Sequence, residues 1–287
     1  MGEGSYLIDQ QIGVSHGFAG GGRNLDKPTV YTKARLKVYP HTRVKQVATG
    51  AIFPLVQGEP KPRPYAVSPP GQAKDQERSM EMSRQRAKAK IRDLALCNSF
   101  DYFFTWTINP QLLDRYDPKI VYHKLRIFLA NAVRRKGFSY LIVPEYHAPK
   151  SGEDKPAIHF HGLCNLGGVK IERAKGKNGR CLTDKEGRPV YNMVSWKYGY
   201  STCVPLDGAH ERTANYITKY ITKSDSNKIF GKWYLHSRDL VKGPDIVPLG
   251  PENYDEFRDE EKLKVHIQTE FEVHDGLRVL SEEFHDF

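Results

Sequence analysis

The alternation of helix-like and strand-like segments between residues 76 and 223 constrains the fold of this chain more than any other feature. Apolar residues repeat at helical spacing in three segments, at about 76–96, 118–135 and 209–223. β-Branched and aromatic runs predict strands at 100–108, 139–146, 157–165 and 198–206, with one more short strand at 233–235. This order predicts an α+β fold in which helices pack on a mainly antiparallel sheet.

Local signals fix several boundaries of these elements. Asp117 followed by Pro118 is a typical N-cap and first helical residue, and Gly137 is placed to end the same helix. Asp207 is a candidate cap for the last helix. The polar loop 147–156 lies between two strands, and it therefore predicts a hairpin that brings their side chains close together.

The flanking segments differ from this central region. Residues 1–75 are predicted to form a basic N-terminal extension; 29–39 alternates apolar and basic residues as a strand does, and 57–72 contains five prolines, as an extended linker does. We expect the main folded domain over 76–240 and an acidic C-terminal tail over 241–287.

The formal net charge of +10 is unevenly distributed along the chain. Residues 251–287 contain 12 acidic and 4 basic residues, a net charge of −8, so residues 1–250 carry +18. Lysine and arginine gain affinity for phosphates by releasing counterions, so this charge favours a nucleic-acid partner over a merely solvated basic surface.

Signals for membranes and for secretion are missing from the sequence. No apolar run approaches the roughly 18 residues that span a bilayer, and the first residues lack the basic start and apolar stretch of a secretory signal. We therefore expect a cytoplasmic protein with no membrane partner. Reduced thiols rather than disulfides or a zinc knuckle are predicted for four widely spaced cysteines, Cys97, Cys164, Cys181 and Cys203.

The first constellation that could carry chemistry is His159-Phe160-His161. In a strand, residues two apart point to the same face, so both imidazoles could bind one metal ion. Alternatively, one histidine is buried and hydrogen-bonded while the other is exposed. Glu145 ends the preceding strand and is the candidate third ligand, with His147 and Glu153 as rivals. A carboxylate with two imidazoles suits Mg²⁺ or Mn²⁺ acting on a phosphate.

The second constellation is a pair of tyrosines, each followed three residues later by a lysine: Tyr216 with Lys219, and Tyr220 with Lys223. Residues four apart lie on one helix face, so neither tyrosine has an advantage by spacing. The ordinary pKa of tyrosine is near 10, and a nearby lysine and a divalent cation would both favour the nucleophilic phenolate. Alternatively, both rings merely cover apolar surface of an amphipathic helix.

These motifs in this order resemble the HUH superfamily of rolling-circle replication initiators, and most of all its phage and bacterial-plasmid branch. The resemblance covers about 84–240 and rests on three motifs: Thr105–Thr107, His159-Phe160-His161, and Tyr216-xx-Lys219-Tyr220-xx-Lys223. It implies an RRM-like sheet, metal binding by His159 and His161, and a nucleophilic Tyr216 or Tyr220. Glu145 would match the carboxylate that some members supply, and Lys219 and Lys223 match the motif lysines.

The activity implied by this resemblance is metal-dependent nicking of single-stranded origin DNA, which leaves a 5′-phosphotyrosine link and a free 3′-OH. The expected partners are single-stranded or hairpin origin DNA and the host helicase and polymerase, in the cytoplasm of a bacterial host cell. The chain has no Gly-rich GKS/T phosphate loop, so a fused helicase is not expected. The alternatives are a relaxase- or transposase-type HUH nickase, a histidine-dependent RNA phosphodiesterase, and a non-catalytic nucleic-acid-binding module.

Overall fold

The computed structural model describes residues 34–41, 44–52, 75–149, 155–223, 228–249, 265–274 and 277–285. The chain divides into two compact units. One unit consists of residues 1–39, 43–66 and 245–287, and the other of residues 40–42 and 67–244. The predicted proline-rich linker at 57–72 lies outside the described residues.

The larger unit is built on a seven-stranded sheet in which every pair of neighbouring strands is antiparallel. The strand order is β6-β7-β8-β3-β5-β4-β9. The bounds are Tyr102–Thr107 for β3, Ser139–His147 for β4, Ala157–Asn165 for β5, Ile171–Arg173 for β6, Tyr191–Met193 for β7, Ser201–Pro205 for β8 and Leu235–His236 for β9. The predicted α+β class with a mainly antiparallel sheet is confirmed.

Three α-helices pack on this sheet: α1 (Gln76–Cys97), α2 (Pro118–Lys136) and α3 (His210–Lys223), and a short 3₁₀ helix, η1 (Ile229–Gly231), follows α3. The predicted signals bound α2. The Asp117 carboxylate accepts the backbone N–H groups of Lys119 and Ile120 at 2.7 and 3.2 Å, and Gly137 ends the helix with a φ of 63°.

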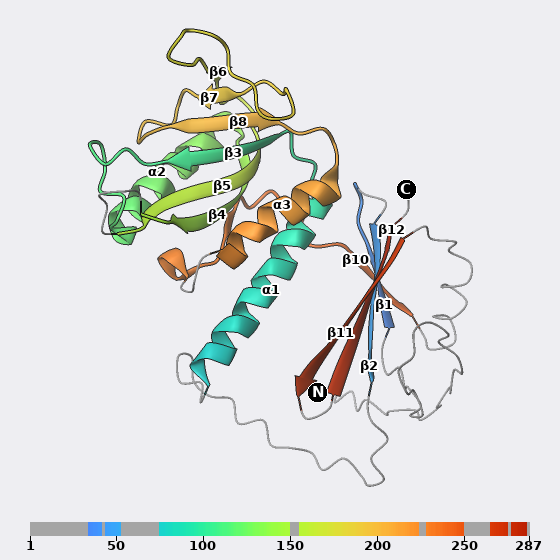
Figure 1. Cartoon of the computed structure of the whole chain (residues 1–287). Helices are drawn as coiled ribbons and strands as arrows, with labels where there is room; N and C mark the ends of the chain where they lie inside the picture. Colours follow the sequence, from blue (N-terminus) through green and yellow to red (C-terminus); the bar gives the residue numbers. More distant parts are fainter. Residues whose placement is uncertain are drawn as a thin grey trace, which may run out of the picture. The chain divides into compact units, whose positions relative to one another are not determined.

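The sheet has a different cover on each face. Figure 1 shows α2 on one face and α1 with α3 on the other. Because strand side chains alternate, Phe104, Trp106 and Phe160 share one face, where they are fully buried in one core cluster with Val121, Leu125 and Leu129 of α2. The alternate residues of these strands point to the opposite face, which α3 covers. They include His159 and His161.

The smaller unit contains a five-stranded antiparallel sheet of order β10-β1-β2-β12-β11. Its strands are β1 (Ala34–Val38), β2 (Val44–Ile52), β10 (Asp245–Leu249), β11 (Val265–His274) and β12 (Leu277–His285). β1 pairs with β10 and β2 pairs with β12, so strands of the predicted N-terminal extension bond directly to strands of the predicted acidic tail. The division at residues 75 and 240 stays a prediction.

Two further features belong to the larger unit. All four cysteines are free thiols, as predicted. The basic stretch 170–190 is largely exposed and joins the sheet through β6, while two isolated bridges within the stretch pair Lys175 with Cys181 and Thr183 with Pro189. In the described part of the chain, no helix is long and apolar enough to cross a membrane.

Candidate active site

The three central strands set the positions of the candidate metal ligands. β5 pairs with β4 and β3 in a register that places Glu145 and Thr107 opposite His159. The same register places Thr105 opposite His161, two residues further along. Residues that are directly opposite or two apart share a sheet face, so Glu145, His159 and His161 lie on the same face of the sheet.

His161 is held at both ring nitrogens. Its Nε2 lies 2.8 Å from Glu145 Oε2, and its Nδ1 lies 3.2 Å from Thr105 Oγ1. An ionised carboxylate only accepts hydrogen bonds, so in the tautomer with its proton on Nε2 this nitrogen donates to Glu145 and Nδ1 accepts from the threonine hydroxyl. Both the His161 and the Glu145 side chains are about one-tenth exposed, at 11% and 10%, which makes this a shielded, oriented pair.

His159 has a different environment. Its ring stacks on that of His147, with centroids 4.7 Å apart and an angle of 22° between the planes. Burial lowers the pKa of His159 to about 4, with further lowering by His147 and His161. The imidazole is therefore neutral at pH 7, and one ring nitrogen has a lone pair available for a ligand.

The structure does not gather all the predicted ligands at one point. Within the described residues, no group of three or more His, Cys, Asp and Glu side chains is arranged to hold a metal ion. Glu145 contacts His161, while His159 lies against His147. The rival ligand Glu153 lies outside the described residues. The donor types match a divalent cation, and the metal role of these residues stays a prediction.

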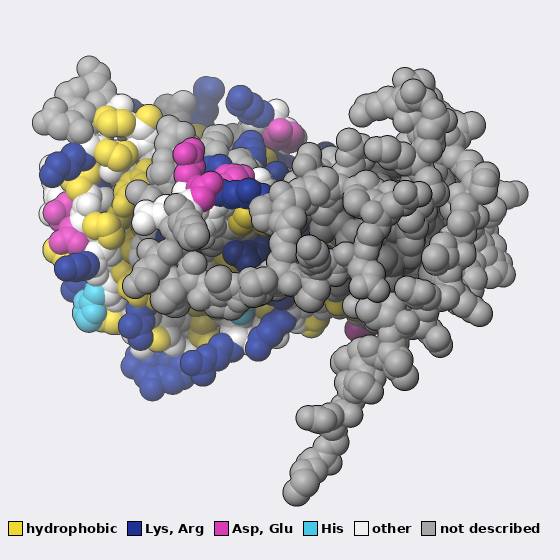
Figure 2. Space-filling view, turned by 90° about the horizontal axis from the view of Figure 1, so that it is seen from below, with side chains coloured by type: hydrophobic (Ala, Val, Ile, Leu, Met, Phe, Trp, Pro, Cys, Tyr) yellow, Lys and Arg dark blue, Asp and Glu magenta, His cyan; other side chains and the backbone are white. Residues whose placement is uncertain are grey.

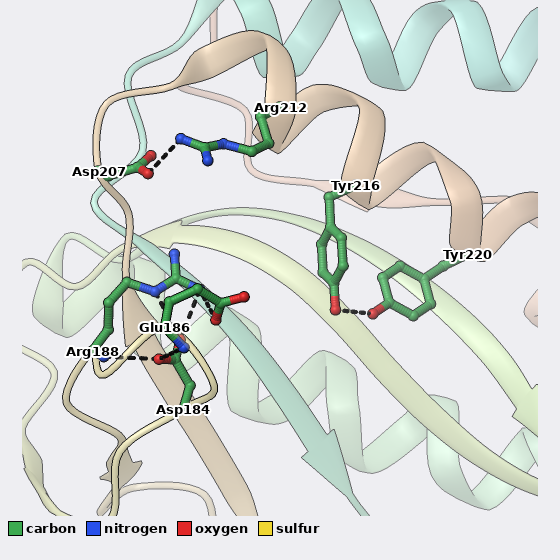
Figure 3. Close-up of polar contacts among 7 residues, drawn as sticks. All are labelled: Asp184, Glu186, Arg188, Asp207, Arg212, Tyr216 and Tyr220. Atoms are coloured by element: carbon green, nitrogen blue, oxygen red, sulfur yellow. Dashed lines mark hydrogen bonds and ion pairs between the residues drawn. The ribbon is translucent and has the colours of Figure 1, made fainter.

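The two tyrosines meet at their hydroxyl groups. Figure 3 shows both side chains extending from α3 towards the sheet, and the Tyr220 hydroxyl donates to the Tyr216 hydroxyl oxygen at 2.7 Å. The rings are nearly perpendicular, with an angle of 82° between their planes. The helix begins after Asp207, which accepts the N–H of Ala209 at 3.1 Å and bonds Arg212 at 2.7 Å.

The tyrosines differ in exposure and in charge environment. Tyr216 is 42% exposed, whereas Tyr220 is 6% exposed. Burial raises the pKa of the Tyr220 hydroxyl, and its hydrogen bond to Tyr216 raises this pKa further. Lys219 Nζ lies 4.0 Å from the ring centroid of Tyr216 and 5.7 Å from that of Tyr220. The side chain of Lys223 lies outside the described residues.

An aromatic stack joins the two constellations. The Tyr220 ring lies on the His161 ring with centroids 3.7 Å apart and an angle of 12° between the planes. Phe103 packs edge-on against Tyr216 at 4.9 Å, and its ring also faces Tyr220 at 6.2 Å. The histidine strand, its carboxylate partner and the tyrosine helix therefore form one site.

Sequence reasoning missed the packing of Phe103 against both tyrosines. It also missed the hydrogen bond between Thr105 and His161. The signal was present in the alternation of the strand. Phe103, Thr105 and Thr107 share one parity of β3, and the buried Phe104 and Trp106 share the other. Antiparallel pairing of β3 with β5 then brings the first set beside the histidines.

The fold and this site define a class of α+β proteins in which a helix that carries two tyrosines packs over a strand that carries two histidines. Residues 101–225 match the family model of the replication-associated protein ORF2/G2P. The matched segment begins one residue before β3 and contains every candidate site residue named above. This similarity supports a role in replication. The chain matches no curated protein and no solved structure.

Proposed function

We propose that this protein is a rolling-circle replication initiator of the HUH superfamily, of the phage and bacterial-plasmid branch, that nicks single-stranded origin DNA. One observation carries the proposal. Tyr220 stacks on His161, which bonds Glu145, and donates a hydrogen bond to Tyr216, all inside the segment that resembles replication-associated proteins. A nucleophile beside histidine and carboxylate groups is what phosphodiester transfer requires.

Tyr216 is the first nucleophile in this proposal. Tyr216 is the more exposed of the two residues, and its hydroxyl oxygen accepts a hydrogen bond from Tyr220, which would stabilise a phenolate. The Lys219 ammonium lies 4.0 Å from the centre of the Tyr216 ring. The tyrosine oxygen bonds to phosphorus while the bond from phosphorus to the 3′ oxygen breaks. The phenol proton ends on that oxygen, which leaves a 5′-phosphotyrosine and a free 3′-OH.

Glu145, His159 and His161 would hold Mg²⁺ or Mn²⁺ in this proposal. When bound, the cation supplies charge neutralisation at the scissile phosphate. The Nε2 atom of His161, which lies 2.8 Å from Glu145 Oε2, would have to be unprotonated to become a ligand, whereas burial keeps His159 neutral at pH 7. Thr105 keeps the His161 ring oriented through Nδ1.

The partners follow from the product of the reaction. The free 3′-OH would serve as the primer for a host polymerase, and unwinding of the nicked duplex would require a host helicase, because the chain has no phosphate-binding GKS/T loop of its own. The site of action would be the cytoplasm of the bacterial host.

The test is incubation of end-labelled single-stranded DNA with the protein and Mn²⁺, followed by denaturing electrophoresis. For a replicon of unknown origin, the probe is a pool of single-stranded fragments from the replicon that encodes the protein. Nicking should produce a shortened fragment with a free 3′-OH. The second fragment should carry the protein at its 5′ end, and protease should remove this adduct.

Glu145→Gln is the sharpest variant for the metal-dependent part. It keeps the side-chain shape and removes the charge, so we expect nicking to fall by more than about 100-fold, the upper end for loss of a merely supporting group. DNA binding should persist, since phosphate contacts come mainly from Lys and Arg. The exposed Glu172→Gln in β6 is the matched control. Unchanged nicking by Glu145→Gln at limiting metal would remove Glu145 from the metal site.

A further inference from the structure

An open groove lies on the α2 side of the larger unit, away from the tyrosines on the α3 face. Its walls are α2 on one side and the segment 228–239, which contains η1 and β9, on the other. The groove has a volume of about 1140 Å³, above the roughly 300–1,000 Å³ typical of small-molecule sites. Its size therefore suits part of a polymer better than a metabolite.

The groove is strongly basic. Five cationic side chains line it, namely Arg126, Arg134, Lys228, Lys232 and Arg238, and Asp239 is the acidic lining residue. Asp239 accepts a hydrogen bond from the Ser139 hydroxyl. Among the described residues, none of the five cations forms an ion pair, so their charges are available to a ligand. Figure 2 shows Lys and Arg side chains in a band along one border of the surface.

Aromatic rings lie between these charges. Tyr122, Tyr140 and Tyr234 line the groove and are half-buried, so part of each residue remains accessible. The Arg126 guanidinium lies 5.8 Å from the Tyr122 ring centroid, and the His236 ring stacks with Tyr234 at 5.9 Å. Cations beside partly exposed aromatic residues are the combination that binds phosphates and unpaired bases together.

The groove is held in shape by contacts below its surface. Tyr122 stacks on Phe230 of η1 at 4.9 Å, which fixes α2 against the opposite wall. The N–H of Ser237 donates to the Tyr140 carbonyl at 2.9 Å, and the N–H of Tyr140 donates to the Ser237 hydroxyl at 3.0 Å. A preformed groove loses little conformational entropy on binding, which favours affinity.

We propose that this groove is a second nucleic-acid site that binds single-stranded DNA independently of the tyrosine site. The five cations would bind backbone phosphates, and the three tyrosines would stack on bases. Stacking needs unpaired bases, so the site should prefer a single strand over a duplex. The inference goes beyond nicking, because it requires neither the tyrosine hydroxyls of α3 nor a metal ion.

The test measures binding of the full chain to a fluorescein-labelled oligo-dT of about 20 nucleotides, slightly longer than one single-strand-binding domain covers. EDTA is present, so cleavage contributes nothing. The triple variant Arg126→Ala/Lys232→Ala/Arg238→Ala should bind at least about tenfold more weakly. The log–log salt slope should become shallower by about 2, because each phosphate that the protein neutralises contributes about 0.7 to it. Nicking of a short oligonucleotide should persist.

The matched control removes three exposed cations from the 170–190 segment, as Lys177→Ala/Arg180→Ala/Lys185→Ala. An equal loss of binding in this control would show that general charge, and not the groove, binds DNA, which overturns the proposal. Equal affinity of the unmodified protein for duplex DNA would overturn it as well. Tyr234→Leu tests stacking, with an expected loss of about fivefold or more.

Cross-linking locates the DNA directly and does not depend on how well a variant folds. A bromouracil-substituted oligonucleotide irradiated with the unmodified protein should attach to peptides from 122–140 and 228–239. Cross-links confined to other peptides would overturn the proposal. If the groove binds DNA as expected and nicking is never observed, the proposed function fails while this inference stands.

Discussion

Tyr216 and Tyr220 are four residues apart on α3, but their side chains differ in exposure and in hydrogen bonding. Tyr216 is open to solvent and accepts a hydrogen bond, while Tyr220 is enclosed between His161 and Phe103 and donates that bond. Burial raises the pKa of the Tyr220 hydroxyl and so disfavours its anion. In the proposed mechanism, Tyr216 would therefore attack first and Tyr220 would support it through the hydrogen bond.

We predict that Tyr216→Phe abolishes the first nick, because phenylalanine keeps the ring packing and removes the attacking oxygen. Tyr220→Phe should retain nicking at a rate lowered about 10- to 100-fold. It removes one hydrogen bond to a charged oxygen, which contributes about 1.5–3 kcal/mol, and each 1.36 kcal/mol changes a rate tenfold. Gel assays of single-turnover nicking measure both rates.

Mass spectrometry of the DNA-linked peptide provides the independent readout for this pair. The adduct should map to Tyr216 in the unmodified protein. An adduct on Tyr220 alone, or an inactive Tyr220→Phe beside an active Tyr216→Phe, would reverse the assignment. Tyr200→Phe is a matched control, because Tyr200 is 76% exposed and lies outside α3.

At the level of single residues, sequence predicted the shared face of His159 and His161, since strand alternation is a local rule. It also placed Glu145 near them, because a hairpin fixes register. The sequence did not predict that Tyr220 stacks on His161. That contact depends on how α3 lies over β5, which arises from tertiary packing and not from periodicity.

Among the secondary-structure elements, β5 carries both histidines of the site, and its close packing restricts substitution at Gly162. Gly162 follows the HxH motif on the face towards α2. A Cβ at this position would lie 2.3 Å from Phe104 Cζ and 2.8 Å from the Leu141 carbonyl oxygen. The ring and the backbone would both have to move, so the glycine is a packing requirement of the strand that bears the histidines.

Gly162→Ala should therefore destabilise the protein by about 1–3 kcal/mol, the usual range for overpacking a core. For a domain of this size, this lowers the melting temperature by roughly 2–4 °C for each kcal/mol, as circular dichroism would measure. Gly243→Ala is the control, since a Cβ there would meet just the flexible end of Lys90, with Nζ at 3.7 Å. Equal melting temperatures for both variants would show that the core around Phe104 adapts.

Elements with strong local signals were predicted with close boundaries. α2 begins and ends at its predicted caps, and β5 spans the predicted 157–165. β6 and β7 were missed, because three-residue strands in a basic loop carry too little periodicity to detect. The strand order of the sheet was likewise unpredicted, since it is set by contacts between segments far apart in sequence.

On the scale of the whole molecule, charge should govern binding to DNA. The net charge of +10 combines a basic body with the acidic residues 251–287. Single-stranded DNA affinity should fall linearly on a log–log salt plot, by about 0.7 per phosphate contacted. A flat salt response in fluorescence anisotropy would mean that the positive charge serves another purpose.

The acidic residues should weaken nonspecific binding by competing with phosphates. Deletion of 251–287 is a poor test, because it removes β11 and β12 from their sheet. Exchange of the six acidic residues in 251–264 for amides keeps both strands. We expect this variant to bind oligo-dT several-fold more tightly at low salt and equally at high salt, where charges are screened. Equal affinity at low salt would contradict competition.

The pairing of β2 with β12 has a consequence for the time course of synthesis. A ribosome delivers β2 early, but its partner β12 emerges only when residues 277–285 leave the exit tunnel. Residues 67–244 are delivered in between and contain a complete sheet of their own. During translation, the edge of β2 that pairs with β12 therefore stays unpaired. An unpaired strand edge is a surface on which a strand of another nascent chain can pair.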